Sequence, residues 1–212
     1  MFEQWDEVEL DLRVEATLAL DDGRPPEPLL VAFDDDAPLA VVALRPFDHQ
    51  GVLQALVEVL ALLLPLGARR IALGLPGRAR DDELGELPLD LGEVADHALL
   101  VVATATGAVR EPAHLTARIL PLAFDGDCWQ WHEECIVDID AEAWDITRAL
   151  GVLLSDAPEG LGAATRDRGE LQAQLARCLL LGHMVALAPA VADDLEPDRA
   201  EGLAPRPPLL EP

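Results

Sequence analysis

The chain of 212 residues carries 40 carboxylates against 15 arginines, contains no lysine, and has a formal net charge of −25. This charge disfavours direct binding to nucleic acids and to anionic membranes, because phosphates attract basic surfaces. The chain has no tyrosine or asparagine and one serine, Ser155, outside any G-x-S-x-G sequence, which excludes lysine-dependent chemistry and a serine hydrolase elbow.

Apolar patterns in the first third of the chain predict a strand, a hairpin and a helix. Residues 8–15 alternate apolar and charged side chains, the period of a half-buried strand. The apolar runs 29–33 and 39–44 flank an acidic loop and predict a β-hairpin. Asp48 is a favourable N-cap, and apolar residues at helical spacing over residues 52–63 predict a helix behind it.

The middle of the chain is predicted to be rich in strands. Residues 70–75 form a short apolar run, and the charged, glycine-containing stretch 78–93 is typical of a surface loop. Residues 98–106 are apolar on both faces, which favours a central strand. Residues 115–124 and 128–137 flank an Asp-Gly-Asp turn and predict a second hairpin.

Two helices are predicted toward the end of the chain, over residues 141–154 and 168–187, followed by an acidic, proline-rich tail that is typical of disorder. The order of elements predicts an α+β fold, in which helices pack on a single mixed, largely antiparallel sheet and a further helix follows at the C-terminal end. We divide the chain into a core domain (1–158), a C-terminal helical element (159–192) and a disordered tail (193–212).

The second hairpin is the first candidate for a functional site. Its strand carries Trp129 and Trp131, followed by Glu133, within an acidic stretch that contains no arginine. Exposed tryptophans are enriched at protein interfaces, and carboxylates around them favour a cationic partner. These three residues are therefore a candidate surface for a basic protein partner, and packing of both tryptophans on the core is the alternative.

The same stretch is a candidate metal site. Cys128, His132 and Glu134 share one face if the segment is a strand, and thiolate, imidazole and carboxylate groups are ligands of zinc. A fourth ligand would be remote in sequence, either His97 or His114. This arrangement would support a metal-dependent hydrolase or a nucleotide-processing enzyme.

A candidate anion site follows the predicted strand at residues 70–75. Gly74 and Gly77 would let backbone N–H groups approach an anion, and Arg78 and Arg80 would clamp it. This is the one locally basic stretch of an acidic chain. The alternative is that its arginines pair with neighbouring carboxylates.

The sequence thus favours a non-catalytic, acidic interaction or regulatory module of a high-GC bacterium, with a basic partner and without a cofactor. The metal-dependent enzyme is the alternative, with zinc as its cofactor. The apolar predicted helix over residues 168–187, from Arg168 to Leu187, is a candidate homodimer seam. Three cysteines, an odd number, and an N-terminus without a basic and apolar leader predict a reducing, cytoplasmic location away from membranes.

Overall fold

The computed structural model describes residues 3–34, 37–47, 51–77, 97–108, 111–133, 136–138, 140, 145–155 and 167–195. The helices are α1 (Glu3–Asp21), α2 (Val52–Leu66), α4 (Asp145–Ser155), α5 (Arg168–Leu180) and α6 (Pro189–Leu195). The strands are β1 (Leu29–Asp34), β2 (Ala37–Ala43), β3 (Arg70–Gly77), β4 (His97–Ala108), β5 (Glu111–Phe124), β6 (Trp129–Trp131), β7 (Val137–Asp138) and β8 (Met184–Leu187).

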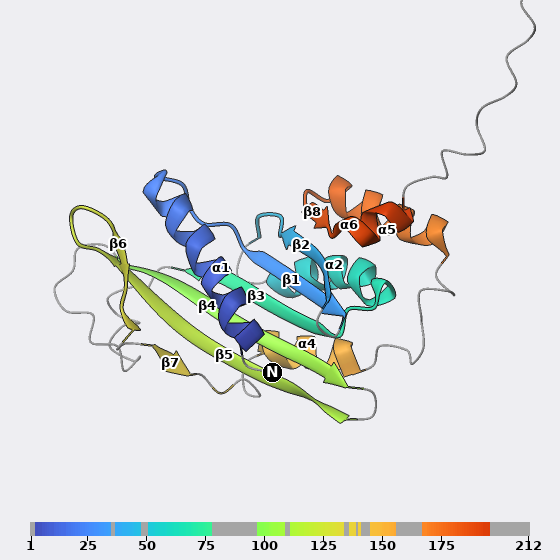
Figure 1. Ribbon diagram of the computed structural model, residues 1–212, viewed down its shortest axis with the longest axis horizontal. Helices are drawn as coiled ribbons and strands as arrows, with labels where there is room; N and C mark the ends of the chain where they lie inside the picture. The colour runs from blue at the N-terminus through green and yellow to red at the C-terminus, as the bar shows by residue number, and fades with distance from the viewer. Residues whose placement is uncertain are drawn as a thin grey trace, which may run out of the picture.

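The strands form one sheet in the order β6-β5-β4-β3-β1-β2-β8, with β7 also paired to β5 (Figure 1). Each pairing between described strands is antiparallel. The predicted α+β class, with helices packed on one sheet and helices at the C-terminal end, is confirmed. Both predicted hairpins form, β1–β2 and β5–β6.

Of the described helices, α1 alone lies across one face of the sheet, over β3 and β4 (Figure 1). Val8, Leu12 and Ala16 recur at helical spacing and are buried against the sheet. They pack on alternate residues of the strands, such as Ala72 of β3 and Leu100 of β4. The burial of this one apolar stripe fixes which side of α1 faces the sheet.

The opposite face of the sheet carries the larger core. Helix α2 is buried along most of its length and packs with α4 and α5 on this face. The strand residues beneath these helices, such as Ile71 and Leu73, alternate along the strand with those that lie under α1. Strand β4 contributes to both cores, which confirms the prediction that it is a central strand apolar on both faces. Helix α2 also confirms the predicted helix; it continues through Pro65 to Leu66 and is capped by Gly67.

The prediction of a strand over residues 8–15 is wrong, because these residues belong to α1. Leu, Glu, Arg and Ala are strong helix formers, and Glu9 pairs with Arg13 one turn later at 2.6 Å. The alternation of apolar and charged residues comes from two helical stripes that interleave in sequence. Val8 and Leu12 are buried, whereas Leu10 and Val14 are exposed. A strand would have put all four on one face.

The prediction of one helix over residues 168–187 is also wrong. Helix α5 ends at Leu180, and Met184–Leu187 form β8, which pairs with β2 at the edge of the sheet. Gly182 adopts a left-handed conformation with φ of +94°, and the His183 N–H donates to the Cys178 carbonyl. This is a Schellman-type helix end, which redirects the chain into the strand.

Several predicted features lie outside the described residues: the Asp48 cap, the loop over residues 78–93, the start of the helix over residues 141–154 and residues 196–212 of the predicted tail. The prediction of disorder is wrong for residues 193–195, because these residues belong to α6. Within the described part of the chain, no helix is both long enough and apolar enough to cross a bilayer.

Candidate functional site

The outward face of α1 exposes a row of large apolar side chains. Leu10, Val14 and Leu18 are 59 %, 47 % and 53 % exposed, although they recur every four residues as core residues do. Carboxylates of identical spacing, Glu7, Asp11 and Glu15, form a second exposed row beside them. We call these six residues the α1 outer face.

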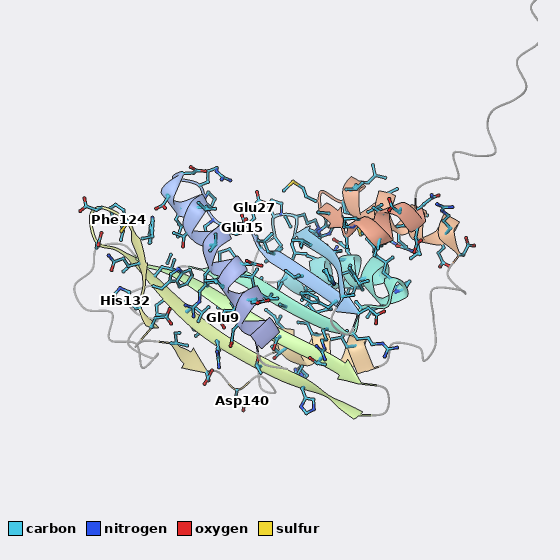
Figure 2. The ribbon with its side chains drawn as sticks, viewed as in Figure 1. Glu9, Glu15, Glu27, Phe124, His132 and Asp140 are labelled. Carbon is cyan, nitrogen blue, oxygen red and sulfur yellow. The ribbon has the colours of Figure 1, made fainter. Side chains whose placement is uncertain are left out.

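The α1 outer face adjoins a cavity of about 260 Å³ that is lined by residues of α1, of the segment before β1, and of β1, β3, β4 and β8. Leu12 and Leu29 line it together with Glu15 and Glu27, and these two carboxylates lie on the side of the molecule seen in Figure 2. Met184, which is 59 % exposed, also lines it. Apolar surface with carboxylates beside it thus extends from α1 to β1 and β8.

Trp131 and Glu133 of the predicted partner surface are turned toward α1. The Arg13 guanidinium lies 5.3 Å from the ring centroid of Trp131, and it forms ion pairs with Glu9 and Glu133. Trp131 is half-buried, and the Arg13 side chain is 13 % exposed. The cation–π contact and the ion pairs fasten β6 to α1, so these side chains already have contacts within the chain.

The turn before β6 is held by Asp125. Its carboxylate accepts hydrogen bonds from the backbone N–H groups of Asp127 and Cys128 at 2.9 Å and 3.0 Å, and from the Gln130 side chain. The bond from Cys128 and that from Asp127 lower the pKa of Asp125, because both favour its charged form. Gly126, with φ of +107°, supplies the left-handed position that the turn requires.

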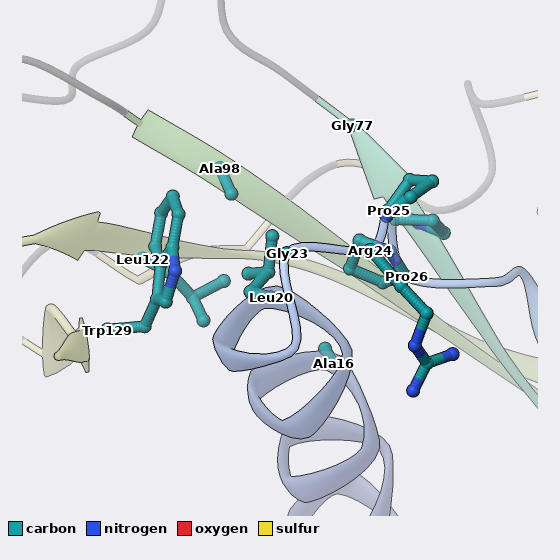
Figure 3. Close-up of a pocket in the computed structure, with 11 residues that line it drawn as sticks. Ala16, Leu20, Gly23, Arg24, Pro25, Pro26, Gly77, Ala98, Leu122 and Trp129 are labelled. Atoms are coloured by element: carbon teal, nitrogen blue, oxygen red, sulfur yellow. The ribbon is translucent and has the colours of Figure 1, made fainter.

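Trp129 and Gly77, predicted for different sites, lie at the same end of the sheet. Both line a cavity of about 540 Å³ between the C-terminal end of α1 and the ends of β3, β4 and β5 (Figure 3). Gly74 instead lies beneath α1, where a Cβ would come 3.2 Å from the Leu12 side chain. Its role is therefore the close approach of α1 to the sheet. Arg78 and Arg80 lie outside the described residues.

The residues predicted to bind a metal are only partly described. Cys128 is exposed at the turn, His132 is half-buried just beyond β6, and Glu134 lies outside the described residues. His97 and His114 lie at opposite ends of β4 and β5, in register with Ala123 and Thr106 respectively. His114 and Ala123 are nine positions apart on β5, which corresponds to about 30 Å of strand, so the two histidines do not converge. Among the described side chains, no three His, Cys, Asp or Glu residues form a group that could hold a metal ion.

A partly buried polar network that the sequence did not reveal links α2 to β8. Glu58 accepts two hydrogen bonds from Arg45, at 2.8 Å and 3.2 Å, and one from Gln54. His183 is 2 % exposed, and its Nε2 lies 3.1 Å from the Glu58 carboxylate. The backbone N–H of Arg45 donates to Nδ1 of His183, so Nε2 carries the proton in the neutral ring and donates it to Glu58.

This network is a structural connection between the helix layer and the edge of the sheet. The hydrogen bonds from Arg45 lower the pKa of Glu58 to about 2, against the desolvation that opposes this shift. Cys178 lies beside it and is buried, with its Sγ 3.6 Å from the Glu58 carbonyl oxygen, and burial raises the pKa of its thiol.

Comparisons with protein-family models, with curated proteins and with solved structures find no match for this chain. The functional argument therefore depends on the geometry of the described residues. The α1 outer face was not predicted, because the alternation of apolar and charged side chains over residues 8–15 indicated a strand.

Proposed function

We propose that this chain is a non-catalytic interaction module that binds a basic, amphipathic helix along the α1 outer face. The observation that carries the proposal is the exposed apolar row of Leu10, Val14 and Leu18 beside a parallel row of carboxylates. A helix that packs only on its own sheet needs one apolar stripe, and α1 has a second. A regulatory role in a reducing, cytoplasmic setting is part of the proposal.

The apolar row supplies affinity. Each of the three side chains is about half exposed, so covering it would contribute about 1 kcal/mol. The apolar side chains of α1 recur every four positions, so they can pack against apolar side chains that recur every three or four positions along a partner helix. Amphipathic helices are usually recognised through anchors of this spacing. The neighbouring cavity, lined by Leu18 and Met184, would accept an apolar side chain at the end of the contact.

The carboxylate row supplies specificity for a basic partner. Glu7, Asp11 and Glu15 are exposed, and within the described part of the chain none of them has an ion-pair partner. The basic residue of α1, Arg13, is engaged on the other side of the helix with Trp131 and Glu133. Lysine or arginine side chains of a partner would therefore meet uncompensated negative charge, and the net charge of −25 would accelerate their approach.

The test is an equilibrium titration with a synthetic amphipathic helix built from leucine and lysine. We expect saturable binding at low salt that weakens as ionic strength rises. The triple variant Leu10→Gln, Val14→Gln, Leu18→Gln should weaken binding at least about tenfold, which corresponds to about 1.4 kcal/mol. The matched control is Leu180→Gln, because Leu180 on α5 is 88 % exposed.

The control separates a specific surface from general attraction between a basic peptide and an acidic protein. If Leu180→Gln and the triple variant bind the peptide equally well, the α1 outer face is not the site and the proposal fails. Loss of affinity in the triple variant alone supports it. Circular dichroism of each variant checks that α1 remains folded.

A further inference from the structure

We infer that the cavity at the C-terminal end of α1 binds a small, uncharged aromatic molecule that carries a carbonyl oxygen. This site is distinct from the α1 outer face, because none of the six residues of that face lines it. It shares Ala16, Arg24 and Pro26 with the neighbouring cavity of about 260 Å³. Figure 3 shows it between the last turn of α1 and the strands.

The cavity has the size and the walls of a site for a small apolar ligand. Its volume is about 540 Å³, and Leu20, Leu122 and Trp129 contribute its large apolar walls. Sites for small molecules commonly have a volume of several hundred Å³ and mostly apolar walls. Space is left because Ala98 and Gly77 stand where larger side chains would fill the end of the sheet. An aromatic ring would pack against the indole of Trp129.

Trp129 also offers a hydrogen bond to such a ligand. Its ring packs on Phe124 with the centroids 5.7 Å apart, which orients the indole. In Figure 3 the ring nitrogen lies on the side that faces Leu20 and Gly23. Within the described part of the chain, this N–H has no hydrogen-bond acceptor. Indole nitrogen only donates, so the ligand atom that meets it is an acceptor such as a carbonyl oxygen.

The charges around the cavity favour an uncharged ligand. Arg24 is the charged residue among the described residues that line it. Its guanidinium pairs with Asp22 at 2.9 Å, and in Figure 3 it runs alongside α1, away from Trp129. Anions would also be repelled by a chain with a net charge of −25.

The experiment uses acetyl(dimethylamino)naphthalene, an uncharged aromatic ketone whose emission moves to shorter wavelength when it leaves water. We expect saturable binding of one molecule per chain. Ala98→Leu, which fills the cavity from β4, should weaken binding by more than about tenfold. Trp129→Phe keeps an aromatic wall and removes the N–H, so it should weaken binding by about fivefold. Leu180→Gln should bind as the unaltered protein does.

Three results would overturn the inference: no saturable binding to the unaltered protein, equal binding to the Ala98→Leu variant, or tighter cavity-dependent binding of the anion anilinonaphthalene sulfonate. Thermal unfolding of each variant checks its fold, and Trp129→Phe provides an independent readout if Ala98→Leu is unstable. Because the basic peptide binds elsewhere, its affinity should be the same in Ala98→Leu, so failure of this site leaves the interaction proposal standing.

Discussion

Replacing Glu58 with glutamine is expected to lower the free energy of unfolding by about 3 kcal/mol at neutral pH. Glu58 is 10 % exposed and is the shared acceptor for the Arg45 guanidinium and for Nε2 of His183. Glutamine keeps the shape but removes the charge, which leaves Arg45 without its carboxylate in a partly buried position. Urea denaturation, followed by circular dichroism, measures the change.

The exposed pair of Asp22 and Arg24 provides the matched control. Their side chains are 64 % and 61 % exposed, so Asp22→Asn should change stability by less than about 0.5 kcal/mol. Equal losses in Glu58→Gln and Asp22→Asn would show that the Glu58 network contributes no more than a surface ion pair.

The Glu58 contribution should also depend on pH in a defined direction. Its pKa is about 2 in the folded chain against an ordinary 4.5, so the folded state favours the carboxylate. The added stability is therefore full above about pH 5 and disappears as the pH falls toward about 2. The difference between the unaltered protein and Glu58→Gln should shrink over this interval, and a constant difference would contradict the assignment.

Truncating Leu12 to alanine is expected to cost about 3 kcal/mol, whereas the same change at Leu10 should cost less than about 0.5 kcal/mol. Leu12 is 4 % exposed and packs over Gly74 on β3, while Leu10 is 59 % exposed two residues earlier. The two variants remove the same atoms from one helix. The difference between their free energies of unfolding, measured by urea denaturation, shows which side of α1 packs on the sheet.

A large loss of stability in Leu10→Ala would contradict the account, because it would give the outer row a structural role. A small loss means that α1 retains an apolar row that the fold does not need. Such a row is what an interaction surface provides, so this comparison separates folding from binding at neighbouring positions.

The sequence predicted most of the sheet because its strands follow local rules. The acidic turn between β1 and β2 and the Asp-Gly-Asp turn before β6 identify both hairpins. The α1 helix was missed because its two stripes interleave with a period of two, the period of a strand. Strand β8 was missed because the apolar run from Cys178 to Leu187 continues across Gly182, and only the fold distinguishes its helical and extended parts.

The functional positions were less accessible from sequence. Trp129 was predicted for a partner surface and Gly77 for an anion site, but only the register of β3 to β6 places them at one end of the sheet. The link between Glu58 and His183 joins residues 125 positions apart, and no local pattern indicates it. The α1 outer face required the correct secondary structure, since a strand would have buried Leu10 and Val14 together with Leu12.

The most direct test of the proposed interaction is a methyl NMR titration of the full chain with the leucine–lysine peptide. Methyl groups report on the side chains that are proposed to make the contact. The account predicts that resonances of Leu10, Val14 and Leu18 shift with one common affinity, while those of Leu180 and Val152, exposed on α5 and α4, do not. Shifts at Leu180 and Val152 without shifts along α1 would contradict it.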